Sequence, residues 1–215
     1  MKDNKGKVMT VTGLIEPSEV GNTSTHDHVI IDFNAILTEP INKEEIHLMD
    51  EKININNIGW VRFNWASSKD NLIYSDVNIA CEELNYYKKS GGNTIVDVTN
   101  IGLGRDPEKL RKISKKTGVN IVMGSSFYVE LAQKKNYTKD GIESLFEIIM
   151  KDINFGVDKT DVKSGIIGEV GCSWPWTDNE KKSMEASVSA HKTTGLPLLI
   201  HPGRNEYAPL EIINY

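Results

Sequence analysis

The sequence predicts an α/β fold built on a parallel β-sheet, and two observations support this prediction. From residue 77 onwards, short runs rich in β-branched residues alternate with longer runs that have helical spacing. Several of the longer runs also carry helix boundary signals, such as Pro107 at a start and Gly118 after an end. Strands that alternate with helices pair in parallel through right-handed crossovers. With 215 residues, the chain (1–215) fits one large domain more easily than two.

The expected elements follow in a regular order after the N-terminal part. Residues 8–15 alternate between apolar and polar side chains and predict a small hairpin, and a first core strand is expected at 23–32. Four further strands are then expected at 93–98, 119–124, 164–171 and 196–201. Helices are expected at 77–89, 107–117, 139–153 and 178–194, and another begins at 208. Asp178 is the expected N-cap of the fourth of these helices.

The stretch at 34–75 lacks this regularity, and we interpret it as an insertion near the mouth of a site. It contains Trp60, Phe63 and Trp65 at near-helical spacing. A helix that packs on the body of the protein explains these aromatic residues better than a binding box does.

Composition excludes several classes of partner. The net charge is −5, and the sequence has no basic stripe to neutralise phosphates, so we expect no nucleic acid partner. No run approaches the roughly 18 apolar residues of a membrane span, so we expect no membrane partner. Cys81 and Cys172 form neither a disulfide framework nor a metal-ligand spacing. A reducing, cytoplasmic location therefore fits the sequence best.

His26 and His28 are the most informative residues. Side chains two apart on a strand point to the same face, so both imidazoles would converge on one point, as two ligands of one metal ion must. A histidine pair of this kind also occurs by chance at surfaces and in cores. In parallel α/β sheets, ligands and catalytic groups lie at the carboxyl ends of the strands. The significance of the histidine pair therefore depends on which residues lie at the other strand ends.

Glu169 and His201 are expected at that same edge. A buried carboxylate without a partner is costly, and a Glu169 placed between two divalent ions would bridge both. The alternative is a Glu169 paired with an Arg or Lys. His201 ends a buried strand at a Pro-Gly turn and would bind the second metal, or else form a core hydrogen bond. For His47 and His191 we expect ordinary surface positions.

Two further residues are candidates for contact with a substrate. Arg204 would place a cation beside the metals, suited to a small anionic substrate, although an ordinary salt bridge explains it equally well. Tyr128, at the end of the third strand, could donate its hydroxyl to a substrate oxygen or only pack against the loop. Arg105 and Asp106 are expected to pair with each other or to cap the next helix.

Four segments of the chain resemble the phosphotriesterase-related proteins of the amidohydrolase superfamily, whose members are metal-dependent TIM-barrel hydrolases. The resemblance runs in order from about Lys7 to Tyr215. The segments are Thr25-His26-Asp27-His28, Gly104-Arg105-Asp106, Ile167-Gly168-Glu169-Val170-Gly171-Cys172-Ser173-Trp174-Pro175 and Ile200-His201-Pro202-Gly203-Arg204.

The resemblance implies a TIM (β/α)8 barrel with two divalent metal ions, zinc being the expected ion. It implies that His26 and His28 bind one ion, that Glu169 bridges both, and that His201 binds the second. The implied reaction is hydrolysis by a metal-activated hydroxide, with the amide of N-acetyltaurine or related N-acetyl amino acids as the scissile bond and Arg204 as a partner for the sulfonate. Lactone or phosphoester hydrolysis on the same site is the alternative enzyme hypothesis.

Length is the main departure from the family pattern. The chain ends after about five strands, so the barrel is expected to be truncated, and the family's sixth-strand histidine and eighth-strand aspartate have no counterpart. We therefore expect a fragment, a shortened isoform or an incomplete gene model. An unclosed barrel exposes a strand edge that favours pairing with another chain, including a second copy. A catalytically inactive chain that acts by binding a partner is the hypothesis from a different class.

Overall fold

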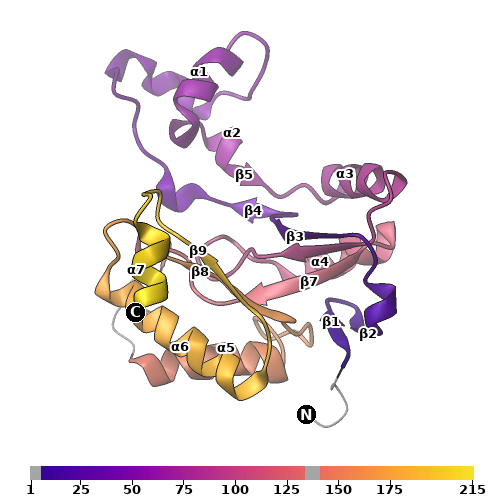
Figure 1. Cartoon of the computed structure of the whole chain (residues 1–215). Coiled ribbons are helices and arrows are strands. Elements are labelled where there is room, and N and C mark those ends of the chain that lie inside the picture. Colours follow the sequence, from indigo (N-terminus) through magenta and orange to yellow (C-terminus); the bar gives the residue numbers. More distant parts are fainter. Residues whose placement is uncertain (1–5, 134–140) are drawn as a thin grey trace.

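The structure, a computed structural model, describes residues 6–133 and 141–215 and is organised around a five-stranded parallel sheet (Figure 1). The strand order is β3-β6-β7-β8-β9, so neighbours in the sheet follow the order of the chain. The strands are β3 (Thr23–Asp27), β6 (Thr94–Asp97), β7 (Asn120–Ser125), β8 (Ile166–Gly171) and β9 (Leu198–His201). This arrangement confirms the predicted α/β class.

Helices connect the later strands of the sheet. The helices from residue 77 onwards are α3 (Val77–Lys89), α4 (Pro107–Thr117), α5 (Ile142–Asn154), α6 (Asp178–Thr194) and α7 (Ala208–Asn214). Gly118 and Gly195 adopt left-handed conformations that end α4 and α6. The predicted start of the third helix at residue 139 lies outside the described residues. In the described part of the chain, no helix is long and apolar enough to cross a membrane.

The core lies between the sheet and these helices. One cluster joins β6 and β7 to α3 and α4, and its fully buried members include Leu110, Ile113 and Ile121. A second cluster joins Ile167 of β8 to Leu145 of α5 and Ala186 of α6. Burial of these apolar side chains fixes the strands, and hence the carboxyl ends where the candidate site lies.

Two small antiparallel pairs flank the main sheet. The predicted N-terminal hairpin is confirmed as β1 (Val8–Thr10) and β2 (Gly13–Ile15), and the Val11 main-chain nitrogen donates to Ile121 O. At the other end of the sheet, β4 (Ile31–Asp32) pairs with β5 (Ile73–Tyr74).

The chain between β4 and β5 forms a separate lobe at the top of Figure 1. It contains η3 (Asn34–Ile36), η4 (Lys43–Asp50), α1 (Ile58–Phe63), η5 (Trp65–Ser67) and α2 (Lys69–Leu72). We call residues 33–72 the upper lobe. That residues 34–75 are an insertion near the mouth of a site stays a prediction.

Several local expectations are corrected by the structure. Residues 23–32 do not form one strand, because the pairing of β3 with β6 shifts register between Ser24 and Asp27, and the chain then leaves the sheet. Thr177, not Asp178, is the N-cap of α6, since its side chain accepts from the Glu180 main-chain nitrogen. Arg105 pairs with Asp152 and Asp158 rather than with Asp106, whose side chain caps α4.

The three aromatic residues of the upper lobe do not pack as one helix face. Helix α1 ends at Phe63, which is 90% exposed, so the expectation that it packs on the body is wrong. The Trp60 indole nitrogen donates to Glu45 within the lobe. Trp65 lies in the following turn, η5, and faces the rest of the molecule.

Candidate metal centre

Three imidazole rings converge on one buried carboxylate at the carboxyl end of the sheet. The Glu169 carboxyl on β8 lies 3.1 Å from His26 Nε2, 3.4 Å from His28 Nε2 and 3.2 Å from His201 Nδ1. His26 belongs to β3, His28 follows it directly, and His201 ends β9. The structure therefore brings together all four residues that the sequence predicts as metal ligands.

Parallel pairing explains why residues so far apart in sequence meet. The strands run in the same direction, so their carboxyl ends lie at one edge of the sheet. The pairing of β8 with β9 places Gly171 opposite His201, with a register irregularity between Ile167 and Val170. This irregularity lies in the segment of β8 that carries Glu169.

The Glu169 carboxyl is 1% exposed, yet its ionised form is favoured. Burial raises its pKa, but hydrogen bonds from His201 and His28, together with their positive charge, outweigh burial and lower the pKa to about 2. A buried carboxylate of this kind needs cationic partners. Ligand atoms of His26, His28 and Glu169 lie within 4.8 Å of one another, and imidazole nitrogen with carboxylate oxygen is a donor set typical of zinc and related divalent ions.

The hydrogen bond between His28 Nδ1 and the Thr99 hydroxyl shows whether a cation fits between His28 and Glu169. The Thr99 hydroxyl donates to Ile30 O at 3.1 Å, so its oxygen accepts from His28 Nδ1, 2.9 Å away. In a neutral His28 the lone pair is then on Nε2, the atom that faces Glu169. A lone pair opposite a carboxylate oxygen is repulsive unless a proton or a metal cation lies between them. The geometry therefore fits a bound cation.

Asp97, Thr99 and Asn100 support the site, and the sequence reasoning did not identify their roles. Asp97 Oδ2 accepts from the Val29 main-chain nitrogen at 2.7 Å, and its Oδ1 accepts from the Thr99 main-chain nitrogen at 3.0 Å. The Asn100 side chain donates to the main-chain oxygen of Glu169. A signal for Asp97 was present, because it is a carboxylate in an otherwise β-branched strand, which was the argument applied to Glu169.

Tyr128 lies against His201, and its contact with a substrate stays a prediction. Its hydroxyl oxygen is 3.3 Å from His201 Nε2, and its ring packs edge-on against the imidazole. Burial and the negative charge of Glu169 raise its pKa to about 12, against the opposing charge of Arg204. The hydroxyl therefore keeps its proton at neutral pH and can donate it in a hydrogen bond.

Arg204 lies at the outer side of the site, against the upper lobe. Its guanidinium carbon is 5.4 Å from the centroid of the Trp65 ring. Among the ion pairs of the described residues, none involves Arg204, so the salt-bridge alternative finds no support there. His47 and His191 are exposed and contact main-chain oxygens of Glu44 and Leu196.

The parallel β/α architecture with a histidine and carboxylate cluster at its carboxyl edge defines the class of β/α-barrel proteins that place their site at that end. Within that class, the chain belongs to the phosphotriesterase family, whose family model matches residues 6–215.

Known relatives agree with this assignment. The chain is 42% identical to a phosphotriesterase-related protein of Nematostella vectensis over 97% of this chain and 60% of that protein. It is 39% identical to the N-acetyltaurine hydrolase of Homo sapiens, over 99% of this chain and 61% of that protein. The chain thus spans about 60% of the length of these relatives.

Solved structures show the same fold. A resiniferatoxin-binding protein from Rhodobacter sphaeroides superposes with a TM-score of 0.92 at 33% identity, over 97% of this chain and 59% of that chain. The organophosphorus hydrolase of Deinococcus radiodurans, at 22% identity, superposes with a TM-score of 0.71 over 96% of this chain and 56% of that chain. The second likeness concerns the fold alone. The five described strands therefore correspond to part of a TIM barrel.

Asp97 gives a prediction about pH. Burial raises its pKa from 3.8 to about 6, against the Val29 hydrogen bond and the charge of His28. The folded protein therefore holds the proton more tightly than the unfolded chain, and this stabilisation, complete below pH 3.8, is lost as the pH rises through about 6. In metal-free protein, we expect the free energy of unfolding of the wild type, relative to Asp97→Asn, to fall by about 2 kcal/mol between pH 4 and 7.

Urea unfolding of both proteins at several pH values measures this difference. A difference that stays constant, or that grows as the pH rises, would contradict the prediction.

Proposed function

We propose that the protein is a metal-dependent hydrolase that cleaves the amide bond of N-acetyltaurine or of related N-acetyl amino acids. The main support for this proposal is the convergence of His26, His28 and His201 on the buried Glu169 carboxylate. The name N-acetyltaurine hydrolase borne by relatives that are 39–40% identical to the chain supports the substrate. Since the chain spans about 60% of their length, the proposal concerns the full-length protein.

In this proposal His26, His28, Glu169 and His201 hold two divalent ions, which we take to be zinc. When bound, such ions acidify water for attack and polarise a scissile carbonyl. Glu169, whose carboxylate lies within 3.1–3.4 Å of all three imidazoles, would be the ligand shared between the two ions. Thr99 holds the Nδ1–H side of His28, which leaves Nε2 as the ligand atom.

The remaining residues bind and orient the substrate. Tyr128 keeps its proton and is placed beside His201 to donate a hydrogen bond to a substrate oxygen. Arg204 supplies a guanidinium without an acidic partner among the described ion pairs, and its N–H groups match the geometry of a sulfonate or carboxylate. In this proposal a small anionic N-acyl substrate contacts both the metal ions and the guanidinium.

Removal of the Thr99 hydroxyl tests how His28 is oriented. We expect Thr99→Val to weaken zinc binding about 10- to 100-fold, because the isosteric valine has no oxygen to accept from His28 Nδ1. Thr99→Ser retains the hydroxyl and is expected to bind zinc nearly as the wild type does. Isothermal titration calorimetry with zinc measures both affinities. Equal affinities of the valine and wild-type proteins would show that Thr99 does not orient the ligand.

Substrate and metal dependence are tested together in the full-length protein. We expect hydrolysis of N-acetyltaurine to stop after removal of metal by a chelator and to return with zinc. We expect His26→Ala to lower kcat/KM at least about 100-fold, because metal assistance contributes several kcal/mol to transition-state stabilisation. His47→Ala, which alters a histidine outside the site, is the matched control.

A panel of N-acetyl amino acids, lactones and aryl phosphotriesters identifies the scissile bond. A preference for a lactone or a phosphotriester would overturn the amide assignment, and full activity after metal removal would overturn the metal dependence.

A further inference from the structure

A continuous row of aromatic side chains connects the upper lobe to the metal centre. The Arg204 guanidinium lies 5.4 Å from the centroid of the Trp65 ring. Trp65 stacks on Phe33 with ring centroids 6.5 Å apart, and Phe33 meets Tyr128 edge-on at 5.7 Å. Tyr128 in turn lies 5.1 Å from the His201 ring. The lobe thus reaches the candidate site through a defined set of contacts.

Trp65 is held in place by main-chain contacts rather than carried on a free loop. The Asn71 side-chain nitrogen donates to Trp65 O at 3.1 Å, and the Thr38 main-chain nitrogen donates to Ala66 O at 3.0 Å. Ser67, two residues later, is buried. Phe63 lies in the same lobe but is 90% exposed, whereas Trp65 is 37% exposed and turns towards Arg204. The turn that carries the indole is therefore anchored within the upper lobe.

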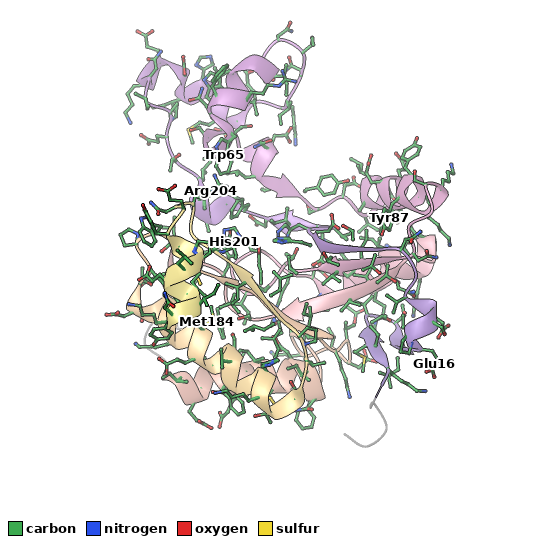
Figure 2. All side chains as sticks on the ribbon, in the orientation of Figure 1. Glu16, Trp65, Tyr87, Met184, His201 and Arg204 are labelled. Atoms are coloured by element: carbon green, nitrogen blue, oxygen red, sulfur yellow. The ribbon has the colours of Figure 1, made fainter. Side chains whose placement is uncertain are left out.

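The main chain of the loop after β9 packs closely just before Arg204. A Cβ atom at the buried Gly203 would lie only 2.7 Å from Ser173 O. The loop therefore approaches the chain at Ser173 so closely that only glycine fits at position 203. Arg204 follows directly, three residues after His201. In Figure 2 the labelled residues Trp65, Arg204 and His201 lie one after another from the upper lobe down to β9.

A guanidinium above an indole ring keeps its N–H edges available for an anion. The ring face attracts the cation, and the planar N–H fork remains free to form paired hydrogen bonds to a sulfonate or carboxylate. Without the ring, a long arginine side chain near the surface samples many rotamers, and ordering it on binding reduces affinity.

We propose that Trp65 is a positioning residue that holds the Arg204 guanidinium at the mouth of the metal centre, so that the two together select N-acyl substrates with a sulfonate or carboxylate group. This inference rests on the proposed function, which supplies the hydrolytic reaction. It adds that the Trp65–Arg204 pair determines which substrates are selected. It assigns the upper lobe a part in substrate choice.

Kinetics of the zinc-loaded, full-length protein test the proposal with two substrates. N-acetyltaurine carries the sulfonate, and N-acetylethanolamine, with a hydroxyl in its place, is uncharged. We expect Trp65→Ala to reduce the preference for the charged substrate, the ratio of the two kcat/KM values, by about three- to tenfold, mainly through KM. Trp65→Phe retains an aromatic face and is expected to recover most of the preference. Phe63→Ala is the control within the same lobe.

A double-mutant cycle separates positioning from a merely structural role. If Trp65 acts through Arg204, Trp65→Ala has no further effect on the preference in an Arg204→Ala background. Equal losses for the charged and uncharged substrates, or additive effects of the two substitutions, would overturn the proposal. Failure of Trp65→Phe to recover any of the preference would also overturn it.

Equilibrium binding separates this inference from the proposed function. Calorimetry measures the affinity of the zinc-loaded protein for N-acetyltaurine, whether or not turnover occurs. If the wild type binds it without hydrolysis, and Trp65→Ala weakens binding only while Arg204 is present, the inference holds and the proposed reaction fails. If hydrolysis proceeds but the affinity does not depend on Trp65, the inference alone fails. Absence of binding would overturn the inference.

Discussion

The burial of the Glu169 carboxylate among three imidazole rings is the constraint on which the rest of the site depends. A carboxylate that is 1% exposed needs cationic or hydrogen-bonding partners, and the chain supplies them from His26 of β3, His28 directly after it and His201 of β9. Thr99 directs one nitrogen of His28 away from the carboxylate, and Asp97 holds the chain next to that histidine through the Val29 main-chain nitrogen. The irregular registers at Glu169 and near His26 lie where these side chains must meet.

Much of the fold follows from local sequence signals, and so does the set of candidate ligands. Helix α3 has the predicted bounds because Gly91 and Gly92 follow it, and α4 has them because Pro107 and Gly118 delimit it. The histidine pair at 26 and 28 was visible from its His-x-His spacing, and the carboxylate of β8 was visible because it departs from its apolar surroundings. These features depend only on residues close in sequence.

The remaining features depend on contacts between distant residues, which a single sequence does not report. The predicted strand at 23–32 ends at Asp27, and the Asp97 carboxyl, 68 residues away, accepts from the Val29 main-chain nitrogen just beyond that end. Trp65 faces Arg204 rather than joining a helix face, because its turn is anchored by Asn71 and Thr38 within the upper lobe. The orientation of His28 depends likewise on Thr99, from the neighbouring strand's end. The spacing of apolar and polar residues along the chain predicts local secondary structure and does not predict contacts of this kind.

Anomalous X-ray diffraction at the zinc absorption edge, on crystals grown with zinc, tests most directly the claim that Glu169 and the three histidines hold divalent cations. The account predicts an anomalous peak between Glu169 and His28, with zinc-to-nitrogen distances of about 2.0–2.1 Å to Nε2 of His28. Zinc bound elsewhere on the protein, with no peak beside Glu169, would contradict it.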